Sequence, residues 1–156
     1  MENPKEKIEE LLTRGVSEVI DLDHLKKALT EGKKLRVKLG IDPTSPNIHI
    51  GRSVPILKLQ DFQKLGCQIV LIVGDFTGLI GDTSDKESER PMLTEQIVKE
   101  NMRNYAQQAA KILDINKVEV CYNSEWLKKL GFAEIGFQAD KFSLADFISR
   151  ENKKRG

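Results

Sequence analysis

The chain has 156 residues, with 25 lysines and arginines against 24 aspartates and glutamates, and 39% of its residues are apolar. This composition excludes a disordered chain, and the charge balance gives no sign of a nucleic-acid or membrane surface, although a local basic site is compatible with it. No window approaches 18 apolar residues and the N-terminus lacks the apolar stretch of a signal peptide, so we expect a cytoplasmic protein without a membrane span.

The first third of the sequence predicts helices. In "KEKIEELLTRG" the apolar residues share one face, and Gly15 ends the pattern. Asp23 is placed to cap a second helix, "HLKKALTEG", which we expect to end at Gly32. Residues 1–33 are therefore expected to form an N-terminal helical segment.

Residues 34–123 alternate between strand and helix patterns. "LRVKLGI" alternates apolar and polar residues, "QIVLIVG" is a continuous apolar run, and "KVEVCYN" alternates again. The stretches between them have helical periodicity. Pro55 in the first is tolerated only near a helix start, so that helix should begin at about Gly51 to Ser53. The order β-α-β-α-β predicts an α/β fold with a Rossmann-like parallel sheet.

The C-terminal part is also expected to be helical, with Ser124 and Ser143 as candidate N-caps. Four of the six phenylalanines lie in this part, more than a small three-stranded domain is expected to cover: Phe132, Phe137, Phe142 and Phe147. The cysteines, Cys67 and Cys121, have no metal-ligand spacing, and we predict no metal site.

Two loops follow strands and should meet at the carboxyl edge of the sheet, where such folds bind ligands. The first, residues 42–52, ends where a helix begins, and the free N–H groups of a helix start suit a phosphate. His49 and Arg52 would add donors there, and Gly51 would let a ligand approach the backbone. From the residues alone, His49 is equally compatible with a packed histidine and Arg52 with a solvated surface charge.

The second loop, residues 75–92, is long enough to be functional. Thr77 and Asp82 are polar residues within it, and a carboxylate at the site could hold an ammonium group. Asp82 could equally satisfy its own backbone in an Asx-turn. Lys86 and Arg90 could meet polyphosphate or belong to a solvated loop of mixed charge.

"DPTSPNIHIGRS", taken with "GDFTGLIGDTSDKESER", resembles the HIGH signature and following loop of the bacterial tyrosyl-tRNA synthetase family, within the class I aminoacyl-tRNA synthetases. The similarity runs from about Lys34 to the end. It implies that residues 34–156 form the first half of a Rossmann-like (HUP-type) catalytic domain. The activity it implies is ATP-dependent formation of tyrosyl-adenylate, with Mg²⁺ accompanying ATP, followed by transfer to tRNA(Tyr).

The resemblance also implies roles for individual residues. His49, Thr44 and Arg52 would act on the ATP phosphates, with Lys86 and Arg90 in a loop near pyrophosphate or the tRNA end. The ATP-binding region would run from Pro43 to Arg52, and the adenosine side would be lined by Gly40, Asp42 and Gly51. Tyrosine would be bound by Thr77, Asp82 and Asn123.

Three departures from the family pattern stand out. Arg52 occupies the place of the second HIGH histidine, Thr83 and Asp85 replace a proline and a glycine, and no KMSKS-like stretch occurs. We therefore expect a truncated chain that is inactive or very weak alone. Family members dimerise, which implies a homodimer through the C-terminal helices. The alternatives are a non-enzymatic module of the same ancestry that associates with another chain, and an unrelated nucleotide-binding α/β domain.

Overall fold

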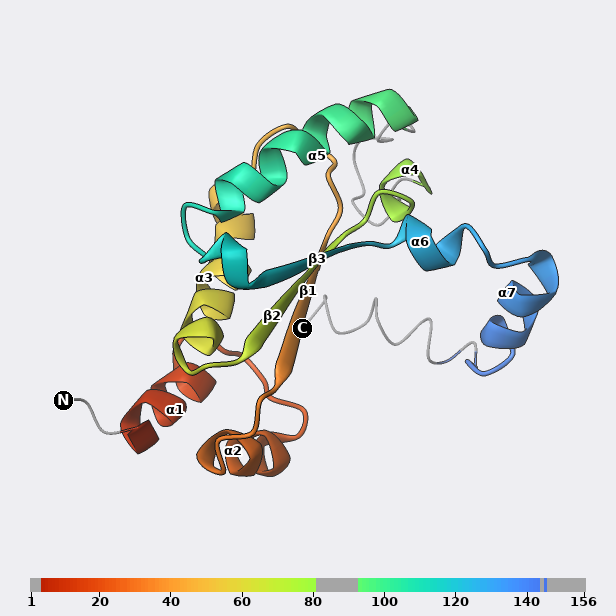
Figure 1. The fold of residues 1–156 in the computed structure, drawn as a ribbon. Coiled ribbons are helices and arrows are strands. Elements are labelled where there is room, and N and C mark those ends of the chain that lie inside the picture. Colours follow the sequence, from red (N-terminus) through yellow and green to blue (C-terminus); the bar gives the residue numbers. More distant parts are fainter. Residues whose placement is uncertain (1–3, 81–92, 144, 146–156) are drawn as a thin grey trace. The chain divides into compact units, whose positions relative to one another are not determined.

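The structure is a computed structural model that describes residues 4–80, 93–143 and 145 (Figure 1). The chain packs as two units, Met1–Ser124 and Glu125–Gly156, and each is described by itself. The predicted boundary between residues 33 and 34 stays a prediction.

A parallel three-stranded sheet forms the centre of the first unit. Its strands are β1 (Arg36–Ile41), β2 (Gln68–Val73) and β3 (Val118–Tyr122), in the order β1-β2-β3. Ile41 pairs with Val73 and Val73 with Tyr122, so the three strands end in register at one edge. The predicted α/β fold and its β-α-β-α-β order are confirmed.

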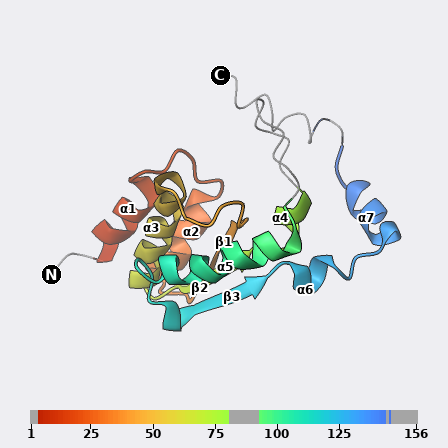
Figure 2. The same cartoon turned by 90° about the horizontal axis from the view of Figure 1, so that it is seen from above.

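Helices α3 (Ile50–Lys64) and α5 (Glu95–Ala109) connect the strands and cover the same face of the sheet (Figure 1, Figure 2). The β1-α3-β2 and β2-α5-β3 connections run in the same direction across the sheet. Connections of the same handedness that do so place their helices on the same face of the sheet. The core between them is apolar and comprises Ile41, Ile56, Leu59, Ile69, Leu71, Tyr105, Ala109 and Leu113. This packing fixes α3 and α5 relative to the strand ends.

Helix α3 begins at Ile50, one residue before the range expected from Pro55. Pro55 is consequently the sixth residue of the helix instead of lying in its first turn. The helix therefore tolerates a residue that cannot donate a backbone hydrogen bond in its second turn. The start of α3 lies directly after His49.

The N-terminal helices are α1 (Pro4–Thr13) and α2 (Leu22–Thr30). Gly15 and Gly32 follow them with φ of 66° and 67°, as their expected role in ending helices requires. The predicted cap at Asp23 was wrong: Asp21 caps α2 by accepting from the His24 N–H at 3.4 Å, and Asp23 lies in the first turn. A second apolar cluster joins these helices to the sheet through Ile8, Leu11, Leu12, Leu29 and Cys67.

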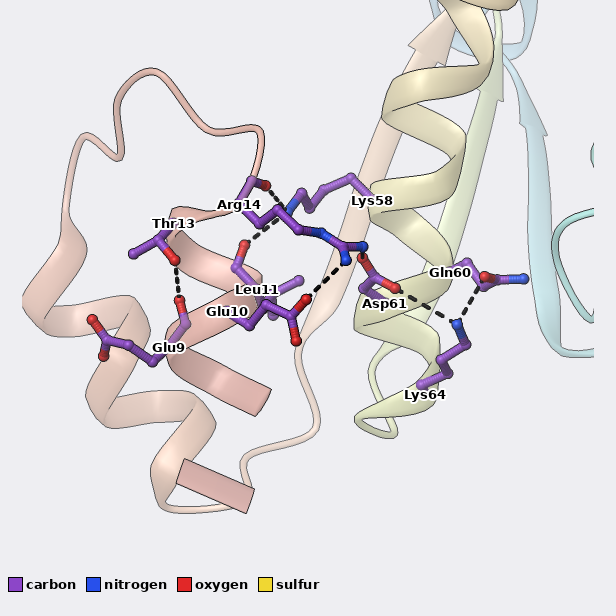
Figure 3. A network of polar contacts seen from close by, with 9 residues as sticks. All are labelled: Glu9, Glu10, Leu11, Thr13, Arg14, Lys58, Gln60, Asp61 and Lys64. Carbon is purple, nitrogen blue, oxygen red and sulfur yellow. Dashed lines mark hydrogen bonds and ion pairs between the residues drawn. The ribbon is translucent and has the colours of Figure 1, made fainter. Parts of the chain in front are cut away.

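A polar network ties α1 to α3 (Figure 3). Lys58 donates to the carbonyl oxygens of Leu11 at 2.9 Å and Arg14 at 2.7 Å, which lie at the C-terminal end of α1. The Arg14 guanidinium pairs with Glu10 at 2.8 Å and approaches Asp61 of α3 at 3.9 Å. Lys58 thus satisfies carbonyls that the end of a helix leaves without partners.

The shorter elements are α4 (Thr77–Ile80), the 3₁₀ turn η1 (Ile115–Lys117), α6 (Ser124–Leu127) and α7 (Phe132–Ala139). Ser124 is the first residue of α6 instead of its cap, and Ser143 adjoins residues outside the described part. Among the described residues of α7, Phe132 and Phe137 are 93% and 73% exposed. None of the helices described is long and apolar enough to cross a membrane.

Candidate functional site

Side chains that follow the three strands form a hydrogen-bonded chain across the carboxyl edge of the sheet. Thr77, four residues after β2, donates its hydroxyl to the Asp42 carboxylate at 2.7 Å. Asn123, directly after β3, donates its amide to the Thr77 hydroxyl oxygen at 2.8 Å. The two loops expected to share one edge therefore meet there, in their described parts. We call Asp42, Thr77 and Asn123 the edge chain.

Gly74 makes room for the edge chain. A Cβ atom at this position would lie 1.7 Å from the Asp42 carboxylate oxygen and 2.5 Å from the Thr77 hydroxyl. The Gly74 N–H also donates to the Ile41 carbonyl at 2.9 Å, which extends the β1–β2 ladder by one bond. Glycine at this position leaves space for the Asp42 and Thr77 side chains; its φ is not positive, so backbone conformation does not call for a glycine here.

Asn123 is 7% exposed and links β3 to the loop after β2. Its side-chain oxygen accepts from the Phe76 N–H at 2.9 Å, while its own N–H donates to the Val73 carbonyl at 3.0 Å. Next to it, Ser124 donates its N–H and its hydroxyl to the two carboxylate oxygens of Asp75, at 2.9 and 2.6 Å. These bonds hold the loop after β2 against the end of β3 and explain why Ser124 is not a helix cap.

His49 immediately precedes α3 in an extended conformation, and its exposed side chain makes no capping hydrogen bond. Its imidazole lies over Gly51, where a Cβ atom would be 3.1 Å from Cε1 and 3.2 Å from Nδ1. A side chain at position 51 would therefore press on the ring. The sequence left two interpretations of His49, a packed histidine and a ligand contact. The exposed ring disfavours the packed histidine.

Arg52 is partly buried, which excludes the fully solvated charge considered from the sequence. Its Nη1 donates to the Asp42 carbonyl at 2.8 Å and to the Tyr105 hydroxyl at 2.9 Å, and its Nη2 donates to the Thr44 hydroxyl at 2.7 Å. All three acceptors are neutral. Within the described residues no carboxylate forms an ion pair with Arg52, so none of the described side chains neutralises its positive charge.

One face of α5 holds the loop after β1. Asn101, 7% exposed, donates to the Pro43 carbonyl at 2.9 Å. One turn on, Tyr105 accepts from Arg52, and Gln108 donates to the Pro46 carbonyl at 3.0 Å and accepts from the Ile48 N–H at 2.7 Å. We call Asn101, Tyr105 and Gln108 the α5 stripe.

The α5 stripe was not among the site residues predicted from the sequence, which indicated only the helical periodicity of this stretch. The ring of Tyr105 does belong to the core, while its hydroxyl reaches the loop. The signal available was polar residues at i, i+4 and i+7 on a helix face that also carries apolar residues. That spacing indicates that the three residues share one face of the helix, but it does not reveal that this face contacts the loop after β1.

The remaining predicted residues divide into two groups. Gly40 lies in β1, two residues before Asp42, and a side chain there would contact nothing within 4 Å. Asp82, Lys86 and Arg90 lie outside the described residues. No group of three or more His, Cys, Asp and Glu side chains suited to a metal ion occurs in the part of the chain that the structure describes.

The arrangement is suited to an anionic ligand. The first N–H groups of α3 have no partner within their own helix and carry the positive end of its dipole. Arg52, in the first turn of the same helix, adds a charge that no described carboxylate neutralises, and the His49 ring lies exposed beside the helix start. The edge chain adds polar groups next to this positive region. A ligand that combines phosphate with a polar organic part would find complementary groups here.

The sequence of this chain is similar to those of known proteins. A family model described as "tRNA synthetases class I (W and Y)" matches residues 30–156. A tyrosine–tRNA ligase of Carboxydothermus hydrogenoformans is 46% identical over 147 residues, covering 92% of this chain and 36% of the relative. That of Thermotoga maritima is 42% identical over 149 residues, covering 96% and 37%. The chain thus spans little more than a third of these relatives.

Solved structures agree in fold. A C-terminally truncated mitochondrial tyrosyl-tRNA synthetase of Aspergillus nidulans superposes with a TM-score of 0.71 at 22% identity, over 96% of this chain and 48% of that one. The tyrosyl-tRNA synthetase of Archaeoglobus fulgidus, solved with L-tyrosine, gives 0.69 at 21% identity, over 99% and 46%. Likeness at this identity establishes the Rossmann-like fold.

Proposed function

Because this chain belongs to the class I tRNA synthetase family of tryptophan and tyrosine, we propose that it carries the ATP-binding half of a tyrosine–tRNA ligase site. The complete enzyme would join tyrosine to ATP, forming tyrosyl-adenylate and pyrophosphate, and then transfer the tyrosyl group to tRNA(Tyr). The names of the relatives support tyrosine over tryptophan. The expected location of this reaction is the cytoplasm.

The observation that carries the proposal is the convergence, at one edge of the sheet, of a helix start and side chains from all three strand ends. In parallel α/β sheets this edge is where ligands bind. The positive start of α3 suits the phosphates of ATP, and the edge chain offers hydrogen bonds for the amino acid. The hydrogen bond between Asp42 and Thr77 supports this proposal, because a reaction between the two ligands requires adjacent subsites.

In the reaction, a carboxylate oxygen of tyrosine attacks the α-phosphorus of ATP, and the bond to the bridging oxygen of pyrophosphate breaks. Negative charge builds on the phosphate oxygens in the transition state, and donors fixed in advance stabilise it. His49, Thr44 and Arg52 are our candidates for this role. Magnesium enters as the MgATP substrate, bound chiefly by phosphate oxygens.

The tyrosine would contact Thr77 and Asn123, with Asp82 binding its ammonium group. Gly40, Asp42 and Gly51 would lie along the adenosine. Lys86 and Arg90 would act near pyrophosphate or the tRNA end. These assignments rest on the family resemblance of the residues that surround them.

The first experiment is calorimetric titration of the 156-residue chain with a sulfamoyl analogue of tyrosyl-adenylate. We expect binding by the unaltered chain and a loss of at least about tenfold in affinity for His49→Ala, the size expected for removing one hydrogen bond to a charged group. The matched control is His24→Ala, which removes the chain's other histidine, an exposed residue of α2. Absence of binding by the unaltered chain would overturn the proposal.

The second experiment supplies the rest of the site. The chain replaces the matching segment of the Carboxydothermus hydrogenoformans ligase, and tyrosine-dependent exchange of pyrophosphate with ATP is measured. We expect exchange by this hybrid and little or none by the chain alone, because both halves must hold the reactants within reach. A folded hybrid that binds the analogue without exchange would instead favour a non-enzymatic module.

Helix α7 supports a second element of the proposal, association through the C-terminal unit. Phe132 and Phe137 are strongly exposed there, and Ile135 is 52% exposed. Apolar side chains in this number on one short helix are typical of an interface. We propose that α7 takes part in a homodimer. Sedimentation should show a dimer that the double variant Phe132→Ser, Phe137→Ser converts to monomer; a monomeric unaltered chain would exclude this.

A further inference from the structure

The hydrogen bond between Arg52 and Thr44 has a fixed direction. A guanidinium has only donors, so in the 2.7 Å contact the Thr44 oxygen must accept. The single proton of the Thr44 hydroxyl is therefore left to donate elsewhere. None of the described residues accepts this proton, and the Thr44 side chain is partly exposed. A threonine hydroxyl, which can donate or accept, is thus biased toward donating to a ligand.

Tyr105 determines where the guanidinium lies. Its side chain is 2% exposed and packed in the core, and its hydroxyl accepts from Arg52 Nη1 at 2.9 Å. The same nitrogen also donates to the Asp42 carbonyl at 2.8 Å. A long, adaptable arginine side chain is thereby held between a rigid aromatic residue of α5 and the backbone of the loop that it serves.

The rest of the α5 stripe holds the loop on either side of Thr44. Asn101 binds the carbonyl of Pro43, the preceding residue, and Gln108 binds Pro46 and Ile48 further along. The Thr44 N–H itself donates to the Asp42 carbonyl at 2.9 Å. Backbone and side chain of Thr44 are thus both fixed before a ligand arrives, which is the condition for efficient electrostatic stabilisation.

We propose that Tyr105 is a positioning residue that, through Arg52, holds the Thr44 hydroxyl as a hydrogen-bond donor to the phosphates of the bound nucleotide. The inference rests on the proposed function, since it needs ATP as the ligand. It gives the arginine at this position a defined role, because its guanidinium orients Thr44 while no described carboxylate neutralises its charge.

A double-mutant cycle distinguishes this positioning role from a merely structural one. If Tyr105 acts through Thr44, then removing its hydroxyl matters only while Thr44 has one. The variants are Tyr105→Phe, Thr44→Val and their combination, with Thr44→Ser as the conservative variant that keeps a hydroxyl. Tyr122→Phe is the matched control, because the Tyr122 hydroxyl forms none of the described hydrogen bonds and the residue lies at the end of β3.

The measurement is the dissociation constant of MgATP for the chain by calorimetry, with urea unfolding to establish that each variant is folded. We expect about tenfold weaker binding for Thr44→Val and about fivefold for Tyr105→Phe, in the range of one hydrogen bond. The double variant should bind no more weakly than Thr44→Val alone. Thr44→Ser should bind more tightly than Thr44→Val because it keeps a hydroxyl, and Tyr122→Phe should bind like the unaltered chain.

Three outcomes would overturn the inference: no effect of Tyr105→Phe, the same factor for Tyr105→Phe in both backgrounds, or no binding of ATP by the unaltered chain. In the last case the adenylate analogue separates the two proposals. If the analogue binds while ATP does not, the proposed function stands and only the inference fails. If neither binds, both fail.

Discussion

Two polar networks in the first unit are each centred on an arginine, and the two arginines have different partners. At the corner of α1 and α3, Arg14 is 71% exposed and lies between the carboxylates of Glu10 and Asp61 (Figure 3). At the sheet edge, Arg52 is partly buried, and the three acceptors that it has among the described residues are neutral. The first arginine is neutralised by its neighbours, whereas no described carboxylate neutralises the second.

The difference lies in what holds each network. The corner consists of ion pairs near the surface, which typically contribute less than about 1 kcal/mol each. The sheet edge is held by buried groups: Asn123 directly after β3, and Asn101 and Tyr105 of α5. Substitutions at the corner should therefore change stability slightly and leave ligand binding unchanged, while substitutions at the edge should change binding.

The largest effect is expected from Gly74→Ala. The added methyl group must displace Asp42 or Thr77, which breaks the edge chain between the two proposed subsites. We expect affinity for the adenylate analogue to fall about 100-fold, near the upper range for a hydrogen bond to a charged group. Because side-chain ends can move aside, the urea midpoint should fall much less. Unchanged affinity would mean that the edge chain does not contribute to binding.

Asn101→Ala comes next. It leaves the Pro43 carbonyl without its buried donor, and we expect a loss of about 2 kcal/mol in the free energy of unfolding. Urea denaturation followed by circular dichroism measures this. Asn104→Ala, an exposed position of the same helix, is the matched control and should change stability by less than about 0.5 kcal/mol. Equal losses for the two variants would contradict a specific role for Asn101.

At the corner, Lys58→Met should cost about 1 kcal/mol of stability, because two carbonyls at the end of α1 lose a charged donor. Affinity for MgATP should not change. Lys64→Met is the control on the same helix, since Lys64 bonds Gln60 and Asp61 of its own helix. A change in ATP affinity for Lys58→Met would show that the corner and the edge are coupled.

The smallest effect concerns Arg36 and Glu119, a pair that joins β1 to β3 across β2 with contacts of 2.7 Å. The hydrogen bond from Arg36 lowers the pKa of Glu119 below its usual value. A lowered pKa in the folded state stabilises the fold above the usual glutamate pKa of about 4.3, and this contribution is lost as the pH falls through the lowered value.

Comparison of Glu119→Gln with the unaltered chain by urea unfolding at several pH values tests this. The stability difference should be present at neutral pH and disappear at acidic pH. A difference that persists in acid would assign the effect to something other than the carboxylate charge.

The order of strands and helices was predictable because the sequence patterns that indicate them are local. Apolar alternation, glycines after helices and the long apolar run each act within a few residues, and the three strands and two crossover helices follow from them. The errors were local too. Asp21 and Asp23 are both plausible caps, and only the backbone at Asp21 decides between them. Pro55 shifted the expected start of α3, because packing of that helix outweighs one missing hydrogen bond.

The site was predictable only in part. His49, Asp42, Thr77 and Asn123 follow from strand ends and from family resemblance. The partner of Arg52 was not accessible, because Tyr105 lies 53 residues away and reads as a core aromatic residue in a helical pattern. Which polar atom meets which across two elements depends on helix rotation and side-chain length, which no pattern in the sequence specifies.

The thiol of Cys67 can report on detachment of the N-terminal helices from the sheet. The thiol is 7% exposed in the cluster that joins α1 and α2 to β2, and burial raises its pKa. It is therefore protonated at neutral pH and screened from alkylating reagents while the cluster is closed. Its rate of modification measures how often the N-terminal helices detach, independently of any ligand at the opposite end of the strands.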